Sequence, residues 1–468
     1  MMLPLLPLIV IVPLAAIIPM LLLEKRHAHA VSLAASVASF ILVVAAVYIS
    51  HSYGMSSLSF SALYIKELGI GLEFDLTDAG LILAVMTSIV FLASSVVGKY
   101  FIGERERIYN LIFLVAEGSS LGVFLSGNLF LFYVFWEISE VMMFFIIFLY
   151  GGFNRRYASL KFILYSIVSS LLLLVAIMLL YTSSVVHTFN IADLRTYSFG
   201  LPIGAQFMLV ALFLGSFLIK MPVFPLHTWL PDAHTEAPTT GSMILAGVLL
   251  KFGGYGLFLM FVLVPLAHNY AFYMALLFIF SSTYAAIVTL RQTNIKRMIA
   301  YTSITDMGIV AMGIVSGNPL AISGSLYLML AHGIAVSLLF LIAGTLDELY
   351  GTMEIKKISG VVRHFPGLTY LFIMASFMLI GLPLTSGFVG DILVFIGSFS
   401  SFRLVSLLPI LGIIVVGATL FWVSEITFFG ASRTTEPYNV VEREVMVGAL
   451  ILVAASVVLG VLPFLLLG

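Results

Sequence analysis

Nine ionisable side chains interrupt otherwise apolar segments of the chain. They are Glu117, Glu137, Glu140, Lys220, Lys251, Asp306, His332, Asp391 and Glu425. An ionisable group at the centre of a membrane-spanning helix costs about 2.5–3.5 kcal/mol on insertion scales, so it is seldom retained without a partner or a use. A set that mixes carboxylic acids, lysines and a histidine can pass a proton from one member to the next. The residue types therefore predict a proton relay; the alternative is a bundle with scattered structural ion pairs.

Lys220 stands at the end of an apolar run and opens the segment KMPVFPLHTWLPDAHTEAP. Pro222 and Pro225 lack a backbone N–H, and their rings clash with the preceding turn, so the helix must kink or unwind there. Broken backbone inside a bilayer is tolerated only within a bundle or beside a hydrated cavity, and interrupted helices mark ion sites in transporters. We expect Lys220 to carry and release a proton, rather than to reach towards a membrane surface.

A second interrupted helix is predicted at GLPLTSGFVGD, which contains Pro383 and Gly387 and ends on Asp391. The two interruptions lie five spans apart, which predicts two five-helix repeats. An odd offset between repeats gives them inverted topologies. Asp391 is either a proton carrier or a cap that hydrogen-bonds the end of the broken helix.

The elements that position these residues are membrane-spanning helices. The chain is 62% hydrophobic and only 9% charged, with a mean hydropathy of +1.18, whereas soluble domains contain about 25% charged residues. Apolar runs long enough to cross a bilayer recur about fourteen times, at 2–23, 31–50, 79–98, 108–126, 129–151, 157–182, 204–232, 240–265, 269–290, 298–316, 319–345, 368–395, 404–429 and 445–467.

The predicted fold is therefore an all-α polytopic membrane protein with two inverted five-helix repeats. Residues 1–107 hold three N-terminal helices, 108–265 the first repeat, 269–429 the second repeat, and 430–468 the fourteenth helix. The first run is followed by basic residues and shows no cleavage site, so we expect a retained helix rather than a signal peptide. The polar connections are too short to form a separate soluble domain.

Basic residues predict the orientation of the helices. Most of the 21 lysines and arginines fall in the odd-numbered connections, at 25, 26, 99, 105, 107, 155, 156, 161, 291, 296, 297, 356, 357, 363, 433 and 443. The even-numbered connections hold only Lys66, Arg195 and Arg403. Because cytoplasmic loops collect Lys and Arg, both termini should lie on the outer side of the plasma or inner membrane.

Several chemistries are disfavoured by what the sequence lacks. There is no cysteine, hence no thiolate for an iron–sulfur cluster or structural zinc, and no metal or cofactor site is predicted. The glycine-rich GGYG at 253–256 lies inside an apolar helix with no preceding strand, which favours close helix packing over nucleotide binding. A net charge of −1 argues against a nucleic-acid partner.

Five motifs carry a resemblance that covers essentially the whole chain. They are FYVFWE ending at Glu137, KMPVFPLHTWLPDAHTEAPTTGSMILAGVLLKFGGYGL at 220–257, IKRMIAYTSITDMG at 295–308, LAHGIAVSLLFLIAG at 330–344, and GLPLTSGFVGD at 381–391. The chain resembles the antiporter-like membrane subunits of respiratory complex I, a superfamily that includes subunits of membrane-bound hydrogenases and Mrp-type sodium/proton antiporters. It is most similar to the M-type subunit, which carries an acid at the second broken helix, where L-type and N-type subunits usually carry lysine.

The resemblance implies that Glu137 pairs with Lys220 and that the proton passes through Lys251 and His332 to Asp391. One departure concerns helix five: family members often have a proline about five residues after its glutamate, whereas Met142 stands here, and Glu140 replaces an apolar residue. This leaves the role of Glu140 open.

Other assignments also have alternatives. Asp306 is either the counterpart of Glu137 in the second repeat or part of a capped polar cluster. His332 is either a relay member, since histidine titrates near neutral pH, or a helical histidine bonded to a backbone carbonyl. The sequence assigns no role to Glu117 or Glu425.

The resemblance implies partners as well. We expect further membrane subunits, including other antiporter-like ones, surrounding lipid, and a peripheral redox arm that holds the iron–sulfur clusters and other redox centres. The favoured function is redox-driven proton translocation in a complex I-like or hydrogenase-type assembly. The alternative is a Mrp-type sodium/proton antiporter subunit without a redox partner. A structural spacer that has lost transport is disfavoured because Glu137, Lys220 and Lys251 are all present.

Overall fold

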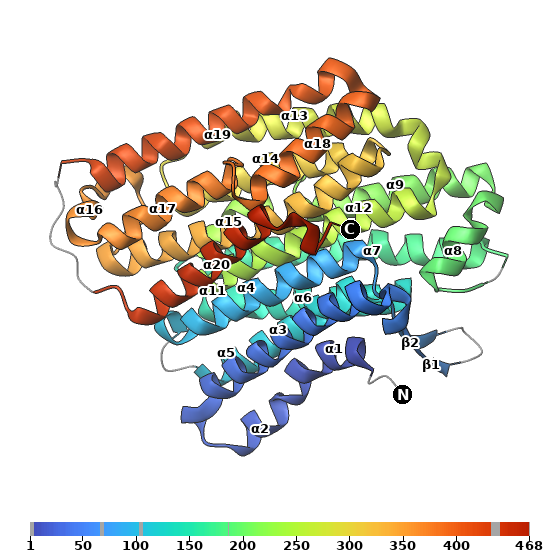
Figure 1. The fold of residues 1–468 in the computed structure, drawn as a ribbon, viewed down its shortest axis with the longest axis horizontal. Coiled ribbons are helices and arrows are strands. Elements are labelled where there is room, and N and C mark those ends of the chain that lie inside the picture. The colour runs from blue at the N-terminus through green and yellow to red at the C-terminus, as the bar shows by residue number, and fades with distance from the viewer. Residues whose placement is uncertain (1–3, 66–69, 103–105, 186, 432–439, 468) are drawn as a thin grey trace.

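The computed structural model describes residues 4–65, 70–102, 106–185, 187–431 and 440–467. Figure 1 shows a bundle of long helices that run in nearly the same direction, with the N-terminal helices at one side of the bundle and α19 at the other. Three of the basic residues used to predict the orientation, Lys66, Arg105 and Arg433, lie outside the described residues.

The N-terminal half contains the helices α1 (Leu5–Ala15), α2 (Ile17–Leu22), α3 (Ala28–Tyr53), α4 (Asp78–Ile102), α5 (Glu106–Leu125), α6 (Leu129–Tyr150), α7 (Arg155–Ser183), α8 (Ile191–Tyr197), α9 (Ile203–Lys220) and α10 (Trp229–Glu236), and the strands β1 (Phe60–Ile65) and β2 (Ile70–Phe74). The C-terminal half contains α11 (Thr239–Ile244), α12 (Leu250–Leu263), α13 (Ala271–Thr289), α14 (Ile295–Val315), α15 (Pro319–Tyr350), α16 (Val361–His364), α17 (Pro366–Leu379), α18 (Ser386–Phe402), α19 (Pro409–Val423) and α20 (Arg443–Val461).

The prediction of a polytopic helical membrane protein is confirmed. Within the described ranges, fourteen helices are long and apolar enough to cross a membrane, and each corresponds to one of the predicted spans. The two predicted interruptions are present, between α9 and α10 and between α17 and α18.

Local details differ from the predicted uniform spans. The first span turns at Ala16, because Pro19 supplies no N–H to the preceding turn and its ring crowds the carbonyl of residue 15. The second connection contains an antiparallel hairpin of β1 and β2. Two spans contain a π-helical turn, at Leu245–Leu249 and Ser424–Phe429. In such a turn the backbone hydrogen bonds join residues five apart instead of four.

The connections separate onto two opposite faces of the bundle. Even-numbered connections bond to one another: Gly127 N–H donates to Glu73 O (2.8 Å), and residues 128 and 190 form a β-bridge. The odd-numbered ones do so on the other face, where residues 294 and 354 form a β-bridge. Figure 1 shows this separation, with β1, β2 and α8 at one end and α16 at the other. The alternation used to predict the orientation is therefore present in the fold.

The core lies around α15, which is buried along most of its length. The helices α4, α14, α17, α18 and α20 pack against it, so the central helix is surrounded by protein rather than lipid. Glycines allow close approach: a Cβ on Gly390 of α18 would lie 2.8 Å from the Cα of Leu328 of α15. Among the described membrane spans, the helix that carries His332 is thus the most enclosed.

The two broken helices share one hydrogen-bond pattern. Val223 N–H donates to Leu218 O, and Leu382 N–H donates to Phe377 O, each at 2.9 Å and each reaching back five residues. The π-helical turns also occupy equivalent spans, one after each broken helix. These correspondences are what a five-helix duplication predicts.

Candidate functional site

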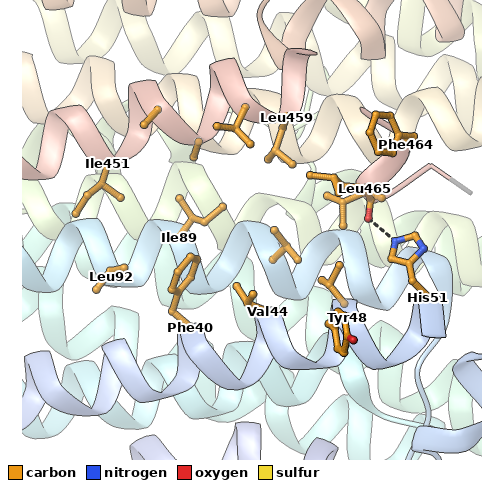
Figure 2. Close-up of a pocket in the computed structure, with 16 residues that line it drawn as sticks. Phe40, Val44, Tyr48, His51, Ile89, Leu92, Ile451, Leu459, Phe464 and Leu465 are labelled. Atoms are coloured by element: carbon orange, nitrogen blue, oxygen red, sulfur yellow. Dashed lines mark hydrogen bonds between the residues drawn. The ribbon is translucent and has the colours of Figure 1, made fainter. Parts of the chain in front are cut away.

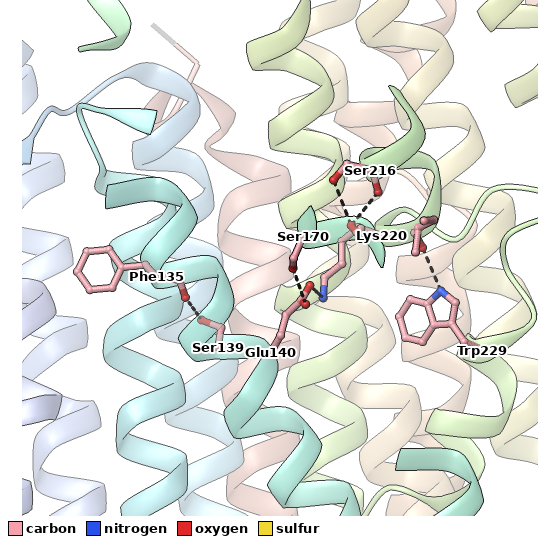
Figure 3. A network of polar contacts seen from close by, with 9 residues as sticks. Phe135, Ser139, Glu140, Ser170, Ser216, Lys220 and Trp229 are labelled. Atoms are coloured by element: carbon pink, nitrogen blue, oxygen red, sulfur yellow. Dashed lines mark hydrogen bonds and ion pairs between the residues drawn. The ribbon is translucent and has the colours of Figure 1, made fainter. Parts of the chain in front are cut away.

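The first break is organised by its two prolines. Pro222 has no N–H to offer Leu218 O, and the N–H of the next residue, Val223, takes that acceptor instead. The shift releases Ile219 O, which accepts a hydrogen bond from the Trp229 indole Nε1 (3.0 Å). Figure 3 shows Trp229 beside the break. The freed backbone groups are thus satisfied by protein, as an irregular segment inside a membrane requires.

Lys220, at the end of α9, forms a buried ion pair with Glu140 of α6. Lys220 Nζ lies 2.5 Å from Glu140 Oε1, and the two side chains are only 1% and 2% exposed. Figure 3 shows the two side chains pointing towards each other between α6 and α9. Ser170 of α7 approaches the other carboxylate oxygen at 3.4 Å.

The predicted pairing of Glu137 with Lys220 is therefore wrong in this structure. Positions 137 and 140 lie three residues apart on one helix, about 60° apart around its axis at 3.6 residues per turn. The rotation of α6 turns Glu140 towards Lys220, while Glu137 is partly exposed and its Oε1 has no hydrogen-bond partner among the described residues.

Aromatic rings complete the surroundings of Lys220. Its Nζ lies 5.4–5.9 Å from the ring centroids of Trp136, Phe162 and Phe252. A cation near aromatic faces in a desolvated site gains attraction from their quadrupoles. The aromatic rings and the Glu140 carboxylate therefore both attract positive charge at Lys220 Nζ.

A second cluster forms around Lys251 of α12. The π-helical turn at Leu245–Leu249 precedes it, and Lys251 Nζ donates to Ala246 O, five residues back, at 2.5 Å. Its Nζ also lies 2.7 Å from His332 Nδ1. Both side chains are buried, so the predicted neighbourhood of Lys251 and His332 is present as a direct contact.

Asp306 of α14 lies on the other side of His332. Its Oδ2 is 3.9 Å from His332 Nε2, too far for a hydrogen bond. Asp306 lies on α14, which packs against α18, the helix that carries Asp391. Lys251, His332 and Asp306 thus form a line of titratable groups that continues towards Asp391.

Asp391 lies in the second turn of α18, beside the second break. The N-terminal cap position of α18 is Thr385, so Asp391 is not a cap of this helix. A Cβ on Gly381, which has φ +69°, would collide with the Asp391 carboxylate, and one on Gly387 would collide with Met378 O. Pro383 and these two glycines let the carboxylate lie against the broken backbone.

Packing links the first break to Lys251. A Cβ on Gly253 would lie 2.8 Å from Met221 N, so α12 contacts the break directly. This confirms the helix-packing interpretation of the GGYG segment. Lys220 and Lys251 therefore lie on two elements in contact, although Lys220 Nζ bonds to Glu140 and Lys251 Nζ bonds to Ala246 O and His332.

Sequence reasoning missed two buried basic groups. Lys296 was counted as a loop residue, but it is buried and donates to Ala237 O (3.1 Å). His234, fully buried, stacks on Phe340 with ring centroids 4.5 Å apart, and neither of its ring nitrogens has a partner in the described structure. The sequence signal that could have identified His234 was its position between the two intramembrane lysines, Lys220 and Lys251.

Glu117 of α5, unassigned from the sequence, accepts a hydrogen bond from Ser36 Oγ of α3 (2.7 Å). Two residues further along α5, Ser119 bonds to Ser139 of α6 (2.8 Å), the neighbour of Glu140. Glu425 lies on the exposed surface of its span and takes no part in the buried clusters described above.

The described residues contain no group of three or more His, Cys, Asp or Glu side chains that could hold a metal ion. The arrangement is instead a set of buried acids and bases within contact of one another at two broken helices. Such a set can move protons by successive protonation and release.

Comparison with known proteins agrees with this geometry. The family model described as NADH:quinone oxidoreductase/Mrp antiporter matches residues 126–421. NADH-quinone oxidoreductase subunit M of Rickettsia prowazekii is 38% identical over 445 residues, covering 93% of this chain and 90% of that protein. NAD(P)H-quinone oxidoreductase chain 4 1 of Nostoc sp. is 35% identical, covering 91% and 81%.

Solved structures share the fold over the same extent. A chain of respiratory complex I from Thermus thermophilus with bound NADH has a TM-score of 0.90 and 28% identity, covering 98% of this chain and 96% of that one. A chain of the Mrp complex from Dietzia sp. has a TM-score of 0.87 at 18% identity, covering 99% and 95%. The resemblance inferred from the motifs is confirmed: the chain belongs to the NADH:quinone oxidoreductase/Mrp antiporter membrane-subunit family.

Proposed function

We propose that this chain is the proton-translocating M-type subunit of an NADH-quinone oxidoreductase, and that protons pass through Glu140, Lys220, Lys251, His332, Asp306 and Asp391. The observation that carries the proposal is the buried line of Lys251, His332 and Asp306, with separations of 2.7 and 3.9 Å. The names of the relatives that cover most of the chain support the choice of complex.

The first carrier is Lys220. Glu140 stabilises its ammonium form at a contact of 2.5 Å. When Glu140 moves away or becomes protonated, the ammonium loses its counter-charge in a buried site and releases its proton. The break after Lys220 allows this end of α9 to move without unwinding an intact helix. Glu137, three residues earlier on α6, is partly exposed and makes no ion pair with Lys220, so it is not a carrier in this proposal.

His332 joins two carriers through its two ring nitrogens. Nδ1 accepts a proton from the Lys251 ammonium, while Nε2 releases one towards Asp306. The 3.9 Å separation at Nε2 requires either a bridging water or an approach of about 1 Å. Asp391, at the second break, then receives the proton from Asp306.

The redox reaction takes place in partner subunits under this proposal. The chain has no cysteine to hold an iron–sulfur cluster, so its own contribution is the ion pathway. We further propose that both termini lie on the outer side of the membrane, that residues 1–107 and 430–468 flank the repeats, and that 108–265 and 269–429 are inverted copies.

A sodium/proton antiporter subunit without a redox partner is the second candidate. The likeness to the Mrp complex chain supports it, but at 18% identity that likeness concerns the fold alone. The buried acids and bases described above would serve either ion pathway.

Membrane vesicles that contain the native complex test the proposal. Addition of NADH should acidify the vesicle interior, as recorded with a fluorescent pH indicator, and Lys251→Met should abolish the signal while NADH oxidation by the peripheral arm continues. Sodium exchange driven by an imposed pH gradient, with no response to NADH, would establish the antiporter instead. A matched control is Lys357→Met, since Lys357 is an exposed residue paired only with Glu354 among the described ion pairs.

A further inference from the structure

An apolar groove of about 850 Å³ runs along the outside of the bundle, away from the buried acids and bases. Its floor is α4, with Val85, Ile89 and Leu92, and its walls are α3 and α20. Figure 2 shows the side chains of the three helices facing the groove. The volume lies in the upper part of the range of about 300–1,000 Å³ that is usual for ligand sites.

The groove spans half of a membrane. On α3 it extends from Phe40, near the middle of the helix, to His51, near its end at Tyr53. Eleven residues at 1.5 Å per residue give about 17 Å. The hydrocarbon core of a bilayer is about 30 Å thick, so the groove matches the depth of one leaflet.

The end of the groove that lies near the membrane surface carries residues typical of the membrane–water interface. His51 Nε2 lies 2.8 Å from Leu465 O, which holds the segment after α20 across this end of the groove. Tyr48, beside it, is 70% exposed, and Tyr is typical of the headgroup level. The groove lining contains no Lys or Arg among the described residues, so it offers no site for a net negative headgroup.

We propose that this groove holds an acyl chain of a phospholipid from the leaflet that contacts the even-numbered connections. A transmembrane helix is about 20 residues long, so it would extend well beyond this groove, which ends at the middle of α3. A flexible acyl chain fits a narrow half-membrane groove, and van der Waals packing is the main source of attraction between apolar surfaces in lipid. The lipid is recognised by its chain, and its headgroup lies beside Tyr48 and His51.

The test uses the intact complex in its native membrane, supplied with a phospholipid that carries a photoreactive diazirine on one acyl chain. After illumination, mass spectrometry should find lipid adducts on the α4 peptide at Ile89, which is only 5% exposed on the groove floor. Adducts should also form at Ile414 of α19, which is 61% exposed and lies outside the groove lining. Labelling of Ile414 without any labelling of α4 would overturn the proposal.

A groove-filling variant provides the matched comparison. Ala454→Phe places a ring in the groove from α20 and should cause loss of the adduct at Ile89 while labelling at Ile414 persists. Ala418→Phe, on an exposed position of α19 outside the lining, should leave both adducts unchanged. Persistence of the Ile89 adduct in Ala454→Phe would contradict the proposal.

A second arm needs no bulky substitution in the groove wall. A benzoylphenylalanine at position 40, in place of the native Phe40, should cross-link to phospholipid in the assembled complex. A cross-link to another protein subunit would show that a partner helix fills the groove and would overturn the lipid assignment.

Discussion

Replacement of Glu140 should stop proton pumping, and replacement of Glu137 should not. Glu140→Gln keeps the shape of the side chain but leaves the buried Lys220 ammonium without a carboxylate at its 2.5 Å contact. Removal of one partner of a buried ion pair costs about 3–5 kcal/mol. At about 1.4 kcal/mol for each factor of ten in an equilibrium constant, the arrangement with an unpaired buried charge becomes at least a hundredfold less favourable than the paired one.

The assay is NADH-driven proton uptake in membrane vesicles, normalised to the amount of assembled complex. Glu140→Gln should lose most of the uptake, whereas Glu137→Gln should retain most of it, because Glu137 makes no ion pair with Lys220 in this structure. Glu140→Asp, which keeps the charge on a side chain shorter by one methylene, should recover part of the activity.

The double substitution Glu140→Leu with Lys220→Met separates stability from transport. It removes both buried charges, so the complex should assemble as well as the native one or better. Its proton uptake should nevertheless be absent. A vesicle preparation in which Glu140→Gln pumps normally while Glu137→Gln does not would refute the assignment of the pair.

Three further predictions concern other parts of the chain. Asp391→Asn should abolish proton uptake and Asp391→Glu should retain part of it, since Asp391 lies inside α18 rather than at its cap; an active Asn variant with an inactive Glu variant would remove this residue from the relay. A cysteine at Arg156 should react only with a thiol reagent supplied from the cytoplasm, and one at Ser183 only with reagent from outside; reversed labelling would invert the topology. Gly381→Ala should lower the thermal stability of the complex by about 1–2 kcal/mol from its left-handed backbone alone, and more from its collision with Asp391; an unchanged melting temperature would contradict the close approach seen at the second break.

The membrane spans and their interruptions could be predicted because a long apolar run or a proline determines the local backbone structure without reference to distant residues. Pro222 removes a backbone donor whatever surrounds it. The partner of Lys220 was not predictable in the same way. Glu137 and Glu140 lie close together around one helix, and only the packing of α6 against α7 and α9 determines which acid contacts the lysine.

Other features of the site also depend on tertiary structure. The π-helical turn before Lys251 contains no proline or charged residue from which it could be predicted. It nevertheless supplies the carbonyl of Ala246, to which Lys251 Nζ donates. Lys296 was counted with the loop residues because it follows a polar stretch, but it is buried and donates to Ala237 O, just after the end of α10. The β1–β2 hairpin was missed because a short pairing within a polar connection has no strong alternating pattern.

The ion pairs of Asp232 limit how far a movement at the first break can spread through the bundle. Its two carboxylate oxygens contact Lys161 (2.7 Å) and Arg297 (3.0 Å), which ties α10 to α7 and α14 on the face of the odd-numbered connections. The break between Lys220 and Trp229 separates this anchored half from α9. A displacement of Lys220 is therefore not transmitted as a rigid-body shift to α10, which stays tied to α7 and α14 while the lysine moves. Movement at the first break can thus remain confined to the end of α9.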